Sequence, residues 1–171
     1  RIPFSVVTGN DLMLVRLETP KGVIPVNTTA SSPLLEIRNN GFNPIVDAKV
    51  TCEIINNLNS RVYLDSLSVS LDTSESKLIS FSPLEFDDLG DYYVNIINNW
   101  PLEHEPGYND TIYTTYSTRF SQDLGISAHL LPHNKDTLEL NESLKPSIQV
   151  TNYGLDTMSN VRIAIALVNS A

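Results

Sequence analysis

The sequence is poor in several features that many proteins depend on. Its 171 residues include one cysteine, Cys52, and one tryptophan, and only 18% of the residues are charged. A single cysteine cannot form a disulfide within the chain, so a packed core must hold the fold. No apolar run approaches the ~20 residues of a membrane-spanning helix. We find no glycine-rich phosphate loop and no Ser/His/Asp arrangement, so we expect a protein that is not an enzyme.

Basic residues are also scarce. The chain has 11 Lys and Arg residues against 20 Asp and Glu residues, a net charge of −9. An acidic surface repels phosphate backbones and anionic lipid, so neither nucleic acid nor direct membrane insertion is expected. Hydrophobic residues make up 41%, which is enough for a packed core. The abundant Asn, Ser and Thr favour turns and strand faces over helix interiors.

An internal repeat predicts the domain organisation. Asp11 and Asp123 lie 112 positions apart (123 − 11), and so do Pro20 and Pro132. Further along, residues 33–41 match 146–154 and residues 48–54 match 161–167, with one residue inserted. The repeat predicts a complete module at 10–119 and the first half of a second module at 120–171. Residues 1–9 are then the last strand of a preceding module or a linker, and we expect that processing or fragmentation removed the true start.

Within the complete module, the hydrophobic period is that of β-strands. A two-residue alternation predicts one strand whose buried face is formed by Val46, Ala48, Val50, Cys52 and Ile54. Asn39-Asn40-Gly41 follows an apolar strand and predicts a turn with positive φ. Further strands are expected at 61–68, 77–81, 91–97 and 111–116. The predicted fold class is all-β, with tandem immunoglobulin-like antiparallel β-sandwich modules.

The second half-module should carry an incomplete core. By the repeat alignment, six apolar side chains point into it: Ile126, Ile148, Val150, Ile163, Ile165 and Leu167. Leaving them in water would forgo on the order of 10 kcal/mol. We therefore expect residues 123–168 to be ordered against further strands of the natural chain or of another chain, or to add strands to a shared sheet.

Several of these motifs together resemble a known family. Asp-Leu opening a strand, a Pro-containing gap, an apolar strand ending in Asn-x-Gly and an alternating strand resemble the immunoglobulin-like, cell-adhesion-related bacterial domains (CARDB-type). Segments 89–94 and 105–110 resemble the end of such a module, and Asp88-x-Gly90-x-Tyr92 resembles the tyrosine corner. The resemblance implies a structural or adhesive spacer in a long, repetitive, extracellular bacterial surface protein. The alternative is an accessory or carbohydrate-binding module of a secreted hydrolase.

A tripeptide of Asp, Ser or Thr and an apolar residue occurs four times, which makes Ser66, Thr111, Thr137 and Thr157 candidate O-glycosylation sites on loops or exposed strand ends. It is similar to the acceptor of Bacteroidota secreted proteins. That similarity implies a glycoprotein of a lineage that exports gliding adhesins by type IX secretion. Asn27, Asn109 and Asn141 also match Asn-X-Ser/Thr, but turn and strand chemistry explains so many Asn residues more simply.

The remaining candidate sites concern ligands. Asp87, Asp88 and Asp91, with Glu85, form an acidic segment that is a weak calcium candidate, because hard cations prefer several oxygen ligands. Asp11 and Asp123 could hold a further linker ion, although solvated loops explain these acids more simply. No other cofactor is expected.

The histidines and Cys52 have simpler explanations than a site. His104, His129 and His133 lack the spacing of metal ligands. Cys52 is expected to be a small buried hydrophobic residue.

Trp100, Tyr108 and Tyr113 lie near a loop rich in Pro and Gly (100–107), where aromatic side chains can form a sugar platform or a protein contact. Of these, Trp100 and Tyr108 are the weak candidates for ligand binding. Alternatively, Trp100 packs over one end of the sandwich. The expected partners are neighbouring modules of the same chain, a surface glycan, or another surface or secretion protein.

Overall fold

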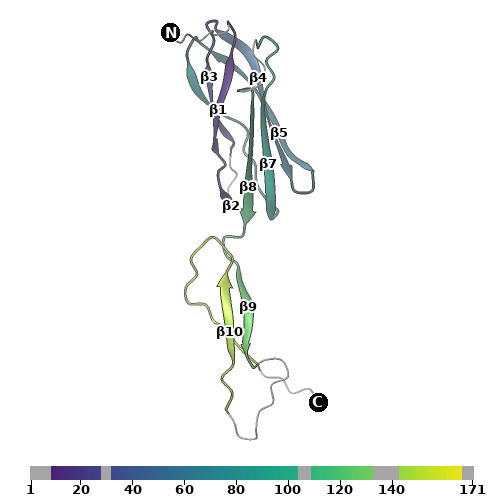
Figure 1. Cartoon of the computed structure of the whole chain (residues 1–171), viewed down its shortest axis with the longest axis vertical. Helices are drawn as coiled ribbons and strands as arrows, with labels where there is room; N and C mark the ends of the chain where they lie inside the picture. The colour runs from purple at the N-terminus through teal and green to yellow at the C-terminus, as the bar shows by residue number, and fades with distance from the viewer. Residues whose placement is uncertain (1–8, 28–31, 104–108, 133–142, 167–171) are drawn as a thin grey trace, which may run out of the picture. The chain divides into compact units, whose positions relative to one another are not determined.

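The computed structural model describes residues 9–27, 32–103, 109–132 and 143–166 (Figure 1). These residues form ten β-strands. The chain divides into two compact units, Arg1–Arg119 and Phe120–Ala171. Nowhere in the described ranges is there a helix long and apolar enough to cross a membrane. The predicted strand at residues 1–9 falls almost wholly outside the described residues.

Unit 1 is a sandwich of two sheets. One sheet has the order β1 (Leu12–Thr19), β3 (Leu34–Asn39), β6 (Ser76–Ser80). The other has the order β2 (Val23–Pro25), β8 (Thr111–Arg119), β7 (Gly90–Asn98), β4 (Ile45–Asn56), β5 (Arg61–Leu71). All neighbours are antiparallel except β2 and β8, which are parallel. The adjacent β8, β7 and β4 occupy the places of strands G, F and C in an immunoglobulin sandwich. The predicted all-β sandwich is thus confirmed.

The core lies between the two sheets and follows from the period of two. In β7, Tyr92, Val94 and Ile96 are 4%, 1% and 0% exposed, while the residues between them face outward. Three core aromatics pack at one end: the ring of Phe86 meets those of Tyr92 and Tyr116 edge-on, with both pairs of centroids 5.0 Å apart. Such edge-to-face pairs add to the energy of simple burial.

The start of β4 differs from the sequence-based prediction. The pairing of β4 with β5 shifts register between Ile45 and Ala48, and Asp47 has a φ of 51°. This irregularity places Ile45 in the core at 1% exposure and leaves Val46 63% exposed. The prediction that Val46 belongs to the buried face is wrong, because an extra residue in a strand reverses the side-chain direction that strict alternation assumes.

The turn after β3 also differs from the prediction. No residue from Asn39 to Gly41 has positive φ. Gly41 is instead required for a close approach of backbones, because a Cβ atom there would lie 2.7 Å from the carbonyl oxygen of Gly9 and 2.8 Å from the amide nitrogen of Asp11. The fully buried Asn39 side chain organises the turn: its Nδ2 donates to the Asn43 carbonyl (2.9 Å) and its Oδ1 accepts from the Gly41 N–H (3.0 Å).

The predicted tyrosine corner is confirmed. The Tyr92 hydroxyl donates to the carbonyl oxygen of Asp88 at 3.0 Å, four residues upstream. Thr118 of β8 donates to the same oxygen at 2.7 Å, so the corner also ties the start of β7 to the neighbouring strand. Burial, and then the negative charge of Asp88, raises the pKa of Tyr92, which keeps the hydroxyl a donor.

The described residues of unit 2 form one antiparallel pair of strands, β9 (Leu124–Leu131) and β10 (Ser147–Asn152). Its turn has the same bonds as the turn of unit 1. Asn152 Nδ2 donates to the Asp156 carbonyl (2.8 Å), and Asn152 Oδ1 accepts from the Gly154 N–H (3.0 Å). A Cβ atom on Gly154 would lie 2.6 Å from the Asp123 nitrogen. The hydrogen-bonded turn formed by Asn39 and Gly41 therefore recurs at Asn152 and Gly154.

The backbone pairing recurs as well. In unit 1, the Asn40 N–H donates to the Asp11 carbonyl at 2.9 Å; in unit 2, the Tyr153 N–H donates to the Asp123 carbonyl at 2.7 Å. Both strand pairs also share one register, which the following cross-strand partners show: Leu12↔Asn39 and Leu14↔Ile37 in unit 1, and Leu124↔Asn152 and Ile126↔Val150 in unit 2. The β1–β3 and β9–β10 strand pairs, called hairpins below, therefore share one register and one Asn-x-Gly turn.

The apolar face of unit 2 is exposed, whereas the equivalent face of unit 1 is covered by a second sheet. Ile126 is 68% exposed, whereas its counterpart Leu14 is 4% exposed. Ile163 and Ile165 are 48% and 50% exposed, Ile148 and Val150 are half-buried, and Leu167 is outside the described residues. The exposure does not come from a shifted register, since the register equals that of unit 1.

The expectation of a shared sheet or of covering strands is therefore not met within the described part of unit 2, where β9 and β10 pair only with each other. Residues 161–166, which the repeat aligns with β4, form no strand.

Candidate functional site

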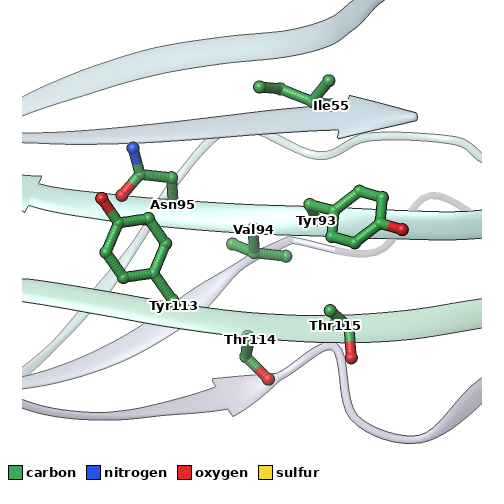
Figure 2. Close-up of a pocket in the computed structure, with 7 residues that line it drawn as sticks. All are labelled: Ile55, Tyr93, Val94, Asn95, Tyr113, Thr114 and Thr115. Carbon is green, nitrogen blue, oxygen red and sulfur yellow. The ribbon is translucent and has the colours of Figure 1, made fainter. Parts of the chain in front are cut away.

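A groove lies on the outer face of the five-stranded sheet of unit 1, where β4, β7 and β8 run side by side (Figure 2). The alternation that buries Tyr92, Val94 and Ile96 turns Tyr93 and Asn95 outward on β7. The groove has a volume of about 490 Å³. It is lined by Ile55, Tyr93, Val94, Asn95, Tyr113, Thr114 and Thr115.

The strand register brings the lining residues together. Asn95 on β7 is the cross-strand partner of Tyr113 on β8, and Tyr93 is the partner of both Thr115 and Ile55. Tyr113 is 78% exposed and Tyr93 is 49% exposed. In Figure 2, the two tyrosine rings lie toward opposite ends of the groove, and the phenol end of Tyr113 lies next to the Asn95 amide. Residues 18 positions apart in the sequence (113 − 95) thus form one surface.

The Asn95 amide is unusual within this surface. Its Oδ1 atom is buried and has no hydrogen-bond partner. A buried acceptor without a partner costs about 1–3 kcal/mol, so such groups are rare in folded proteins. Glu53 on β4 is the cross-strand partner of Asn95 on the other side, and its carboxylate, which forms an ion pair with Arg61 at 3.6 Å, cannot donate to Oδ1. The amide therefore retains an unused acceptor beside an exposed aromatic ring.

The lining of the groove is aromatic and polar but uncharged. Its lining carries two phenol rings, one primary amide and two threonine hydroxyls, with aliphatic Ile55 and Val94 between them. No lining residue is a carboxylate, a histidine, a cysteine or a cation. The groove can stack against an apolar face and exchange hydrogen bonds with neutral polar groups, but its side chains do not supply an acid–base pair.

The acidic calcium candidates do not converge. Asp87, Asp88 and Asp91 are all exposed, and Asp91 accepts a hydrogen bond from the Ser117 hydroxyl. In the ranges that the structure describes, no group of three or more His, Cys, Asp or Glu side chains is placed to hold a metal ion.

Asp11 and Asp123 have different surroundings. Asp11 is 7% exposed, and its carboxylate accepts hydrogen bonds from the side-chain amides of Asn40 and Asn109, each at 2.8 Å. Asp123 is exposed. At this module start, Asp11 tightens the fold by bonding to asparagines.

Trp100, which was predicted as part of an aromatic platform, does not line the groove. Trp100 is 7% exposed and belongs to the core at the end of β7, so it offers little ring face to a ligand. Its backbone N–H donates to Asn98 Oδ1 at 3.0 Å, which holds the residue in place. Tyr108 lies outside the described residues.

The glycosylation candidates lie in varied positions. Ser66 is exposed in the middle of β5, not at a strand end, and its hydroxyl lies 3.0 Å from that of Thr51. Thr111 is half-buried at the start of β8, Thr157 is exposed after β10, and Thr137 is outside the described residues. Of the three sequon asparagines, Asn27 is exposed with a φ of 53°, Asn109 is engaged with Asp11, and Asn141 is not described.

Cys52 is a core residue with 0% exposure, and burial raises the pKa of its thiol to about 12. It is therefore a neutral thiol at physiological pH and not a nucleophile. His129 is exposed on β9, and His104 and His133 lie outside the described residues.

Sequence reasoning singled out Tyr113 as an aromatic near the 100–107 loop, but it missed Tyr93 and Asn95 and did not bring the three residues together. The signal was present in part, because alternation along 91–97 puts Tyr93 and Asn95 on one face. The position of Tyr113 opposite Asn95 depends on the register between β7 and β8, which the sequence does not reveal.

Comparison with known proteins supports the fold. No family model matches the chain, and no curated protein matches its sequence. The solution structure of a CARDB domain from Pyrococcus furiosus is similar over 66% of this chain and 97% of that domain, with 20% identity and a TM-score of 0.52.

A crystal structure of that domain in complex with di-metal ions matches over 68% of this chain and 95% of that chain, with 18% identity and a TM-score of 0.51. A domain of a candidate cell-surface protein from Methanosarcina acetivorans matches over 64% and 92%, with 18% identity and a TM-score of 0.47. At these identities the first two likenesses show the fold alone. The chain contains a β-sandwich with the fold of the CARDB domain.

Proposed function

We propose that this protein is a non-catalytic, structural or adhesive spacer, built of successive β-sandwich modules, in a long extracellular bacterial surface protein. The observation that carries the proposal is the recurrence of one hairpin in both units, with the same register and the same Asn-x-Gly turn. Domains of about this size have their own hydrophobic core, so sandwich modules in series can set a distance without any further chemistry. The CARDB fold is consistent with this role.

The exposed apolar face of unit 2 supports the proposal that unit 2 belongs to a second module. In unit 1 the hairpin of β1 and β3 is stable because a second sheet covers Leu14 and Ile37. The equivalent face around Ile126 has the same apolar character but is open to solvent. A pair of strands is at best marginally stable without such a cover. In the proposed array, further strands complete unit 2 as β4, β7 and β8 complete unit 1.

A polar network that holds the start of β1 supports a spacer role for unit 1. At the start of β1, the Leu12 N–H donates to Glu103 Oε2 at 2.8 Å, and the Asn98 side chain donates to the Leu12 carbonyl at 3.2 Å. Asn98 also donates to Asp110 Oδ1 at 2.9 Å. These bonds join the entry strand to the loops at the end of β7 and the start of β8. In the proposed array, a module whose first strand is held in this way would keep a fixed orientation of the chain where it enters the module.

Bacteroidota origin, type IX export and O-glycosylation are part of the same proposal. They rest on the recurrent tripeptide, and the exposed hydroxyls of Ser66 and Thr157 are accessible to a transferase. The intact mass of native protein should exceed that of the bare polypeptide, which is 19.0 kDa for these residues. A native segment at the bare mass would rule out the glycans, while leaving the spacer role untouched.

Single-molecule force measurement on the natural protein tests the spacer role. An array of this repeat should unfold in equal steps, each releasing up to about 390 Å of chain for 112 residues at ~3.5 Å per residue. Unfolding in steps of unrelated lengths would contradict a modular array. The flanking sequence separates the alternative, since a catalytic domain next to these units would favour an accessory module of a secreted hydrolase.

A further inference from the structure

The groove on the outer face of the five-stranded sheet has no role in building the sandwich. The side chains of Tyr93, Asn95 and Tyr113 point away from the core, and Tyr113 is 78% exposed although solvent exposure of so large a ring is unfavourable. Asn95 adds a buried acceptor without a partner on the same face. Both features weaken the free module slightly, and both would be relieved by a ligand that covers the ring and donates a hydrogen bond to the amide.

The lining selects the chemical class of that ligand. It contains no charged side chain, so there is no counterion for phosphate, sulfate or a cation. The net charge of −9 further disfavours anionic ligands. Two phenol rings favour a ligand with an extended C–H face, and the amide favours one with neighbouring hydroxyls that both donate and accept. A pyranose ring combines these two properties.

We infer that the groove formed by Tyr93, Asn95 and Tyr113 binds a neutral saccharide. The Tyr113 ring stacks on the sugar face, the Asn95 amide exchanges hydrogen bonds with adjacent sugar hydroxyls, and Tyr93 covers the next unit of the glycan. The volume of about 490 Å³ is in the range of small-ligand sites and suits a short oligosaccharide more than a folded protein.

A small rearrangement opens the amide to the ligand. The phenol end of Tyr113 lies next to Asn95 in the free protein (Figure 2). Because the ring is mostly exposed, its rotation breaks few contacts and is rapid. The ring moves from the amide onto the sugar, and Oδ1 then accepts from a sugar hydroxyl.

This inference goes beyond the spacer role and does not rest on it. An array of modules can set a distance whether or not its sheet faces bind glycans. The force measurement tests the array, and the binding experiment tests the groove, so the failure of one is distinguishable from the failure of the other.

The test is titration of the ¹⁵N-labelled 171-residue chain with four neutral trisaccharides: cellotriose, maltotriose, mannotriose and tri-N-acetylchitotriose. We expect saturable shifts of the Asn95 side-chain amide and of the β7 and β8 backbone for at least one sugar, with a Kd of about 1 mM or tighter. Absence of saturable shifts for all four sugars up to about 10 mM, which is ten times that Kd, would overturn the inference.

Two variants assign binding to the groove. Tyr113→Ala and Asn95→Ala should each weaken binding about tenfold, since one such stacking or charge-free polar contact contributes on the order of one decade in affinity. Phe42→Ala, which removes a 67% exposed ring outside the groove, is the matched control and should leave the Kd unchanged. Equal Kd values for all four proteins would place the sugar elsewhere and overturn the assignment.

The main competing occupant is a second copy of the chain. Sedimentation of the free protein distinguishes it, because a self-associating face would give a dimer that Tyr113→Ala abolishes. A dimer of this kind, with no sugar-induced shifts, would also overturn the inference.

Discussion

Replacing equivalent residues in the two hairpins should give very different losses of stability. Leu14 and Ile126 occupy the same register position, but Leu14 is 4% exposed and Ile126 is 68% exposed. Leu14→Ala removes a buried side chain from the core between two sheets, while Ile126→Ala removes one that already contacts water. The pair therefore measures the effect of the cover alone, with local strand geometry held nearly constant.

The expected magnitudes follow from burial. Core Leu→Ala substitutions cost about 2–5 kcal/mol, through lost transfer energy and the cavity left behind. A loss of about 3 kcal/mol lowers the Tm of a domain near this size by about 12–24 °C. Ile126→Ala should change stability by no more than about 0.5 kcal/mol, which corresponds to at most about 4 °C.

Calorimetry of the 171-residue chain provides the measurement, with urea denaturation as a second probe. Val46→Ala is the control, because Val46 lies in unit 1 yet is 63% exposed and should behave like Ile126. If Ile126→Ala lowers the Tm as much as Leu14→Ala, the face of unit 2 is covered in solution and our account of its exposure fails. A silent Leu14→Ala would equally refute the assigned core.

Three other predictions concern the turn, the corner and the thiol. Gly41→Ala should destabilise unit 1 by about 1–3 kcal/mol in urea denaturation because its Cβ would meet backbone atoms, whereas Gly154→Ala should disturb only the NMR signals of β9 and β10. Tyr92→Phe should cost about 1 kcal/mol through the lost corner bond, and Tyr93→Phe should be neutral; equal losses would contradict the corner. Burial raises the pKa of the Cys52 thiol from 9.0 to about 12, so folding stability, measured by urea midpoints, should fall as pH rises through that window and fall less in Cys52→Ala.

The sequence predicts much of the fold because the buried faces repeat with a period of two. Alternation places strands β5, β7 and β8 within a few residues of their observed bounds, and the Asp-x-Gly-x-Tyr segment predicts the corner at Tyr92. Alternation fails at Val46, because β4 has one extra residue at this point and Asp47 adopts a positive φ. That irregularity has no hydrophobic signature, so periodicity alone cannot locate it.

The candidate site is less predictable than the fold, for a physical reason. A tryptophan in a loop is an obvious candidate for ligand binding in a sequence, yet Trp100 is buried. Packing a large apolar ring against a nearby core is more favourable than leaving it exposed to solvent. Tyr113 stands out in the sequence only as an aromatic near the same loop, and Asn95 looks like an ordinary strand residue, until the register of β7 and β8 places them opposite each other. An unpaired Oδ1 is a property of three-dimensional surroundings, and no residue pattern encodes it.

The hairpin that occurs twice creates a competition during folding. β1 and β9 carry the same Asp-Leu start, and each pairs in the same register with a strand that ends in an Asn-x-Gly turn, so β9 can take the place of β1 beside β3. On the ribosome, β1 and β3 emerge and pair before β9 is made, and the order of synthesis selects the correct partner. When the whole chain refolds from denaturant, both strands are present together. Exchange of strands between repeats is then a route to slow, misassembled species that synthesis in order avoids.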